Sequence, residues 1–172
     1  MIINIDMDGV LANFDKRKLE ILNGREEPLN SKDFWVLLKE DPYLYRDLEP
    51  MPDAVDLING ILDLLQVNSL DGYCKCPLVV LTAIPKASTM PDAEAHKREW
   101  LSKQEFSFLS HKFKIGPYAS DKWKHCYHRD DILIDDNKKN IEDWVHNGKG
   151  IGIFHISAEK TIKALEEILS IR

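Results

Sequence analysis

Short apolar runs alternate along the chain with longer stretches in which apolar residues recur at helical spacing. Three of the runs are almost uninterrupted, at 2–5, 77–82 and 131–134. Two shorter candidates lie at 112–115 and 150–154. A strand that is apolar at successive positions is buried on both faces, which is typical of parallel sheets. The pattern therefore predicts five short strands in one parallel sheet.

The stretches with helical spacing lie between these runs. They cover 11–23, 53–66, 92–104, 141–145 and 157–170. The stretch at 92–104 is the most polar, and its spacing predicts a helix with Trp100 and Leu101 on the inner side. Strands that alternate with helices predict an α/β domain in which helices cover a central parallel sheet.

The segment 14–52 breaks this alternation. It holds no apolar run that predicts a buried strand, and Pro28, Pro42 and Pro50 interrupt it. A helix is expected over its apolar cluster 34–38, beginning near Asn30. Because the segment directly follows the first strand, we expect a small, mainly helical insertion, with 1–13 and 53–172 forming the core domain.

Composition and charge narrow the possible functions. The 172 residues carry 23 basic and 29 acidic side chains, a net charge of −6, so we expect no binding of long nucleic acid. No apolar run approaches the roughly 20 residues of a membrane helix, and the first residues do not resemble a signal peptide. We therefore expect a cytoplasmic protein that does not associate with membranes. The three cysteines, Cys74, Cys76 and Cys126, have no framework spacing and are expected to be reduced.

Polar side chains follow three of the predicted strands. Asp6 and Asp8 follow the first strand, Thr82 ends the second, and Asp135 and Asp136 end the run at 131–134. Ligands of open α/β sheets bind outside the carboxyl ends of the strands, which meet at one edge. We therefore expect four carboxylates and a hydroxyl to converge at this edge.

Carboxylates brought together in this way repel one another unless a cation compensates their charge. Hard oxygen ligands with room for water and phosphate oxygens suit Mg²⁺. A lysine before the last acidic strand, either Lys122 or Lys124, would add a second cation. The sequence therefore predicts a magnesium site that receives an anionic small molecule.

These residues, in this order, resemble the four motifs of the haloacid dehalogenase (HAD) superfamily of aspartate-nucleophile phosphohydrolases. The segment Asp6-Met7-Asp8-Gly9-Val10-Leu11 is similar to the first motif. Thr82 resembles the second motif, Lys122 the third and Asp135-Asp136 the fourth. The resemblance implies the HAD-like fold, a Rossmannoid three-layer sandwich with a central parallel sheet and a small helical cap inserted after the first strand.

A narrower resemblance is to the 5′(3′)-deoxyribonucleotidase family. The segments 6–14 and 48–52 are similar to characteristic stretches of that family, and 96–100 and 120–122 also resemble it. The resemblance implies a Mg²⁺-dependent phosphatase of nucleoside monophosphates.

The resemblance also implies a role for each acid. Asp6 would attack phosphorus and form an aspartyl-phosphate. Asp8 would protonate the leaving oxygen and then activate the hydrolytic water. The Mg²⁺ ion would be bound by the Asp6 carboxylate, the Asp8 backbone carbonyl and an acid of the fourth motif, with Asp136 favoured over Asp135.

Contacts to the phosphate and the base are implied in the same way. Thr82, Ala83 and Lys122 would hold phosphate oxygens. Aromatic residues of the cap would stack on the nucleobase. They are Phe14, Phe34 and Trp35, with Tyr43 and Tyr45 as weaker candidates.

The sequence departs from the nucleotidase pattern at two positions. Ala83 stands where that family carries Ser, and Ser120 stands where it carries Arg, which removes one hydroxyl and one cation. Substrate preference is therefore open, and another small phosphoester, a nucleic-acid 3′ phosphate or a non-catalytic HAD-like binding module are alternatives. A dehalogenase is disfavoured because that branch needs neither Mg²⁺ nor the acid at Asp8. A monomer and a homodimer are both compatible with the sequence.

Overall fold

The protein is built on a five-stranded sheet in which every strand is parallel to its neighbours. The computed structural model describes residues 1–28, 31–66, 76–116 and 118–170. The order of strands across the sheet is β3-β2-β1-β4-β5. The strands are β1 (Ile3–Ile5), β2 (Leu78–Ala83), β3 (Phe113–Gly116), β4 (Ile132–Asp135) and β5 (Ile151–Phe154). The predicted α/β fold with a five-stranded parallel sheet is confirmed.

The first strand lies at the centre of the sheet, between β2 and β4, and all three of its residues are buried. Ile3 pairs with Leu78 of β2 on one side and with Ile132 of β4 on the other. All three residues are fully buried. The carboxyl ends of β1, β2 and β4 consequently lie side by side, and the residues that follow them are neighbours in space.

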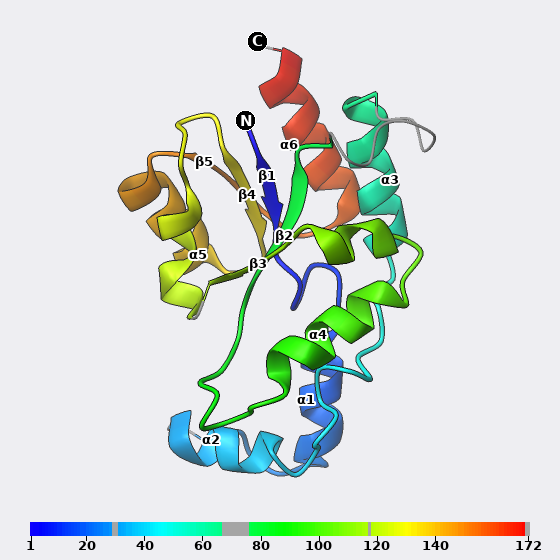
Figure 1. Cartoon of the computed structure of the whole chain (residues 1–172), viewed down its shortest axis with the longest axis vertical. Helices are drawn as coiled ribbons and strands as arrows, with labels where there is room; N and C mark the ends of the chain where they lie inside the picture. The colour runs from blue at the N-terminus through cyan, green and yellow to red at the C-terminus, as the bar shows by residue number, and fades with distance from the viewer. Residues whose placement is uncertain (29–30, 67–75, 117, 171–172) are drawn as a thin grey trace.

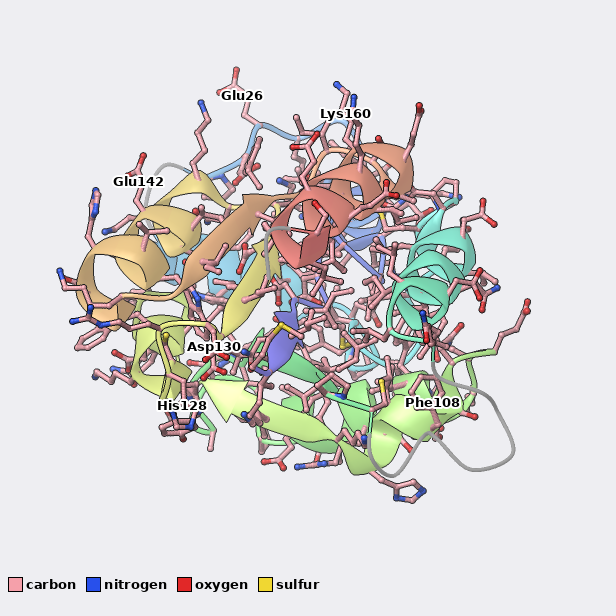
Figure 2. The ribbon with its side chains drawn as sticks, turned by 90° about the horizontal axis from the view of Figure 1, so that it is seen from above. Glu26, Phe108, His128, Asp130, Glu142 and Lys160 are labelled. Atoms are coloured by element: carbon pink, nitrogen blue, oxygen red, sulfur yellow. The ribbon has the colours of Figure 1, made fainter. Side chains whose placement is uncertain are left out.

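Helices cover both faces of the sheet (Figures 1 and 2). The helices α3 (Ala54–Leu64) and α6 (Ala158–Ser170) pack together on one face. The other face is covered by the 3₁₀ helix η2 (Ala119–His125), α5 (Lys138–Asp143) and the π-helical turn η3 (Trp144–Gly148). Figure 2 shows Glu142 of α5 and Lys160 of α6 pointing outward from these two layers.

The segment that follows β1 lies at the end of the molecule toward which the strands point (Figure 1). It contains α1 (Phe14–Leu22) and α2 (Ser31–Leu38). A bridge between Ala12 and Pro50 brings its two ends together. The helix α4 (Ala93–Ser102) and the 3₁₀ helix η1 (Ser107–His111) follow β2, and Trp100 of α4 donates a 2.7 Å hydrogen bond to the carbonyl of Leu48.

Two predicted helix boundaries were wrong. The helix expected over 11–23 begins at Phe14, because the Met7 carbonyl accepts hydrogen bonds from Leu11 and Ala12 in a tight turn and Asn13 caps the helix. The helix expected over 141–145 begins earlier, at Lys138, because the side chain of Asn137 caps it. Asn30 and Cys74 lie outside the described residues, while Cys76 and Cys126 are free thiols, as expected. No helix in the described part of the chain is long and apolar enough to cross a membrane.

Candidate functional site

A pocket of about 900 Å³ opens at the carboxyl end of the sheet. This volume is at the upper end of the roughly 300–1,000 Å³ that is typical of small-molecule sites. The pocket is lined by the loops that follow β1, β2, β3 and β4, and by residues of α1 and α2 together with Tyr45. It therefore lies between the sheet and the segment 14–52.

The loop after β1 supplies the first acidic residues of the pocket. The backbone N–H of Asp6 still donates to Ile134 of β4, and its carboxylate accepts from the N–H of Met7 at 2.7 Å. Gly9 follows with a φ of +80°, and a Cβ there would lie 2.1 Å from Oδ2 of Asp136. The glycine therefore allows this loop to turn back directly against the acid that follows β4.

One group of charged residues, which we call the Lys122 cluster, consists of Asp6, Lys122, Asp135 and Asp136. The Lys122 Nζ atom lies 2.6 Å from carboxylate oxygens of both Asp6 and Asp135. The lysine is only 2 % exposed. Lys124 is exposed and instead pairs with Asp121, so Lys122 is the lysine that reaches the acids.

The two acids at the end of β4 differ in their burial and in the hydrogen bonds that they accept. Asp135 is fully buried, and each of its oxygens accepts two hydrogen bonds. The donors are Lys122 Nζ, the N–H of Asn137 and the side-chain amide of Asn140. Asp136 is exposed to the pocket. Asp136 is therefore the acid with the more available oxygens, and its predicted role as the favoured metal ligand stays a prediction.

The three acids of the cluster fit a hard divalent cation. Oxygens of Asp6, Asp135 and Asp136 lie within 4.8 Å of one another. Partial burial, then the charges of Asp6 and Asp135, raise the pKa of Asp136 to about 7. Burial and the charge of Asp6 also raise the pKa of Asp135. An excess of crowded carboxylates over lysines would be relieved by a cation, and oxygen ligands of this kind suit Mg²⁺.

A second group, which we call the Lys97 cluster, consists of Asp8, Thr82 and Lys97. The Lys97 Nζ atom donates to Asp8 Oδ2 at 2.5 Å, to Thr82 Oγ1 at 2.8 Å and to the Ala83 carbonyl at 2.9 Å. The Asp8 carboxylate therefore points to Lys97 and is not one of the three clustered acids. The expected contact of its backbone carbonyl with a metal ion stays a prediction.

Burial dominates the electrostatics of Asp8. Burial raises the pKa of Asp8, Lys97 opposes this, and the charge of Asp6 adds to the increase, so that the net shift is upward. A raised pKa favours the protonated form of this carboxyl group, which is the form a general acid needs. The Oδ1 atom of Asp8 is shielded from solvent and has no hydrogen-bond partner in the described part of the protein.

The residues that were predicted to contact a phosphate differ in whether they line the pocket. Lys122 and Ala83 line the pocket. Thr82 is fully buried, and its hydroxyl accepts the hydrogen bond from Lys97 rather than lining the pocket. The expected contact of Thr82 with a phosphate oxygen stays a prediction.

Aromatic residues form the side of the pocket that belongs to the segment 14–52. Phe14, Phe34 and Trp35 all line it, and their contact with a nucleobase stays a prediction. Tyr45 also lines it, with its ring centroid 6.0 Å from that of Phe14 in a stacked arrangement. Tyr43 lies elsewhere, against His96 and Arg46.

Several pocket residues were not anticipated. Lys32, Lys39 and Lys86 line it, and none of them forms an ion pair with any residue that the structure describes. Lys97 was also missed, although its spacing to Trp100 and Leu101 is that of one helix face. Its burial was therefore encoded in the same pattern that predicted the inner side of this helix.

Comparison with known proteins does not assign the chain to a family. No protein-family model matches it, and no curated protein matches it. The function of the site is therefore argued from its residues and their geometry.

Proposed function

We propose that the protein is a Mg²⁺-dependent phosphatase that hydrolyses nucleoside monophosphates through an aspartyl-phosphate intermediate. The observation that carries the proposal is the Lys122 cluster at an aromatic pocket. Asp6, Lys122 and Asp136 line one pocket with Phe14 and Trp35. A nucleophilic carboxylate, cations for a phosphate and flat rings for a base are the three elements that such a substrate requires.

The chemistry uses two acids of the loop after β1. A carboxylate oxygen of Asp6 forms a bond to phosphorus while the bond from phosphorus to the ester oxygen breaks, and protonated Asp8 gives its proton to that oxygen. Asp8, now ionised, takes a proton from water, the water oxygen bonds to phosphorus, and the bond to Asp6 breaks to release inorganic phosphate. The raised pKa of Asp8 supports the first of these tasks.

Cations would position the phosphate during both steps. Lys122 would neutralise phosphate oxygens beside Asp6. Mg²⁺ held by Asp6 and Asp136 would supply Lewis-acid stabilisation of the developing charge. Lys32, Lys39 and Lys86, which form no ion pair with the residues that the structure describes, support an anionic substrate, because they concentrate positive charge at the pocket of an acidic protein.

The proposal is tested by phosphate release from a panel of ribo- and deoxyribonucleoside monophosphates and sugar phosphates, with Mg²⁺ or with EDTA. We expect Mg²⁺-dependent release from nucleotides. Asp6→Asn should lower the rate by at least about 10³-fold, whereas Asp63→Asn, at an exposed position of α3, should leave it unchanged. Activity on sugar phosphates alone would contradict the nucleotide assignment, and unchanged activity of Asp6→Asn would contradict the mechanism.

The role of the aromatic side is tested separately. Trp35→Ala should lower kcat/KM for nucleotides by about 5- to 100-fold, because stacking on a base contributes about 1–3 kcal/mol. It should change kcat/KM for glycerol phosphate, which has no ring, less than threefold. Tyr127→Ala removes an exposed ring that does not line the pocket and is the matched control. Equal losses on both substrates would exclude a stacking role for Trp35.

A further inference from the structure

Lys97 has no donor left for a substrate. An ammonium group has three N–H donors. All three have an acceptor within the protein, in Asp8, Thr82 and the Ala83 carbonyl. Lys97 is also 0 % exposed and does not line the pocket. It is therefore built to hold protein groups in place and not to bind a phosphate.

Packing alone does not account for a lysine at this position. Lys97 lies on the buried face of α4 with Ala93, Trp100 and Leu101. An apolar side chain of similar size is often at least as stable as a buried ion pair. The charge at this position is therefore better explained by what it does to Asp8.

The hydrogen bond from Lys97 distinguishes the two oxygens of Asp8. Oδ2 is bound to Lys97, whereas Oδ1 is shielded from solvent and lacks a partner among the described residues. Asp8 itself lines the pocket. Because Oδ1 is closed to water, the hydrogen bond to Oδ2 is the contact that sets how this carboxylate faces the pocket.

The position of Lys97 is also linked to the segment 14–52. The ring of Tyr45 lies over Lys97, with its centroid 4.5 Å from Nζ. Tyr45 stacks on Phe14, which lines the same pocket. Lys97 therefore connects the end of β2, the loop after β1 and the aromatic side of the pocket.

We propose that Lys97 is a positioning residue that fixes the Asp8 carboxylate through Oδ2, so that this carboxylate can carry out both proton transfers of the reaction. This inference rests on the proposed function and adds a residue to it. Without Lys97 the carboxylate can rotate, and the proton transfers lose their geometry. Lys97 itself should make no contact with the phosphate, because it does not line the pocket, whereas Lys122 does.

The experiment compares Lys97→Met with Lys163→Met, which removes an exposed lysine of α6. With a nucleoside monophosphate, Lys97→Met should lower kcat by about 10²–10⁴-fold, the usual contribution of general acid–base catalysis, and change KM less than threefold. Lys163→Met should match the wild type. A loss of kcat that merely equals the loss of folded protein, measured by circular dichroism, would overturn the proposal.

A second substrate separates the two proton transfers. The leaving group of p-nitrophenyl phosphate needs no proton, whereas hydrolysis of the aspartyl-phosphate still needs Asp8 as a base. Lys97→Met should therefore release about one p-nitrophenol per folded enzyme in a rapid burst and then turn over slowly. Uniformly slow release without a burst would overturn the proposal, because it would mean that attack by Asp6 is damaged as well.

A double variant keeps the test decisive if Lys97→Met does not fold. Asp8→Asn/Lys97→Met removes both charges and leaves no buried ion unpaired. If Lys97 acts only through Asp8, the kcat of the double variant should equal that of Asp8→Asn alone, since the effects of substituting residues that act as a unit are not additive. A further tenfold loss would overturn the proposal. Wild-type turnover that depends on Asp6 establishes the phosphatase independently, so the two claims can fail separately.

Discussion

Two buried lysines meet carboxylates at the same pocket, but their surroundings carry different charges. In the Lys122 cluster, one ammonium group contacts two carboxylates, and the carboxylate of Asp136 lies beside them. In the Lys97 cluster, one carboxylate and two uncharged oxygens take the three hydrogen bonds of the ammonium group. With every group ionised, the first cluster has a formal net charge of −2 and the second has none. A buried lysine therefore does not by itself indicate a phosphate site, because the surrounding acceptors decide what it can do.

This difference assigns separate tasks to the two acids of one loop. Asp6 belongs to the cluster in which carboxylates outnumber the lysine, so that a cation can still bind. Asp8 belongs to the cluster in which one ammonium group faces one carboxyl group. The raised pKa of Asp8 and that of Asp136 have the same leading cause, which is burial. Only Asp136 shares its surroundings with two further carboxylates. The following predictions test whether the two clusters respond differently to mutation, to a divalent cation and to pH.

The largest effect is expected from removing each lysine. Lys122→Met leaves Asp6 and Asp135 buried without compensation, which should lower the free energy of unfolding by about 3–5 kcal/mol in EDTA. Mg²⁺ should restore part of this loss, because it supplies the missing positive charge. Lys97→Met should be destabilised equally with and without Mg²⁺. Urea unfolding under both conditions measures this, and a Mg²⁺ response of similar size in both variants would contradict the distinction.

A smaller effect is expected from the two acids that end β4. Asp136→Asn should weaken Mg²⁺ binding at least about tenfold, while raising the melting temperature in EDTA because it removes one crowded charge. Asp135→Asn should lower the melting temperature in EDTA, because its carboxylate accepts from Lys122 and Asn140. Calorimetric titration and thermal unfolding measure the pair. Tighter Mg²⁺ binding by Asp136→Asn than by Asp135→Asn would contradict the assignment of Asp136 as the more available ligand.

The smallest effect is expected from pH. The carboxyl of Asp136 has an ordinary pKa of 3.8 and a pKa of about 7 in the fold, so its protonated form favours the folded state. Without Mg²⁺, this stabilisation is complete below about pH 4 and is lost as pH rises toward 7. The cation competes with the proton, so the increase in melting temperature caused by Mg²⁺ should grow from pH 5 to pH 8. Asp136→Asn should flatten the trend, and an unchanged trend in that variant would assign it to other groups.

The parts of the fold that the sequence predicted are those with one dominant cause. β1, β2 and β4 are buried on both faces, which requires apolar residues at successive positions. In a chain of this size, an uninterrupted apolar run therefore indicates a buried strand. Because the strands are parallel, their carboxyl ends meet at one edge of the sheet, and the acids that follow them lie close together there. The position of the pocket was therefore predictable from the order of strands and the residues that follow them.

The sequence did not predict which residue of a short 3₁₀ helix is buried, or that a lysine is buried in α4. Lys122 and Lys124 lie two positions apart in the 3₁₀ helix η2, where no periodic pattern distinguishes a buried residue from an exposed one. Lys97 was overlooked because lysine is rarely buried, even though its spacing to Trp100 indicates the inner face of α4. The contact of Thr82 with Lys97 required both β2 and α4 to be in place.

The central position of β1 has a consequence for how the protein folds. Ile3 pairs with Leu78 and with Ile132, so β1, which is synthesised before both partners, completes its hydrogen bonds only when β4 is available. Pairings between such distant segments are slow to form. The cation site needs Asp6 from the start of the chain and Asp136 from its last third, whereas each helix can form locally. During refolding, recovery of Mg²⁺ binding should therefore lag behind recovery of the helical circular dichroism signal.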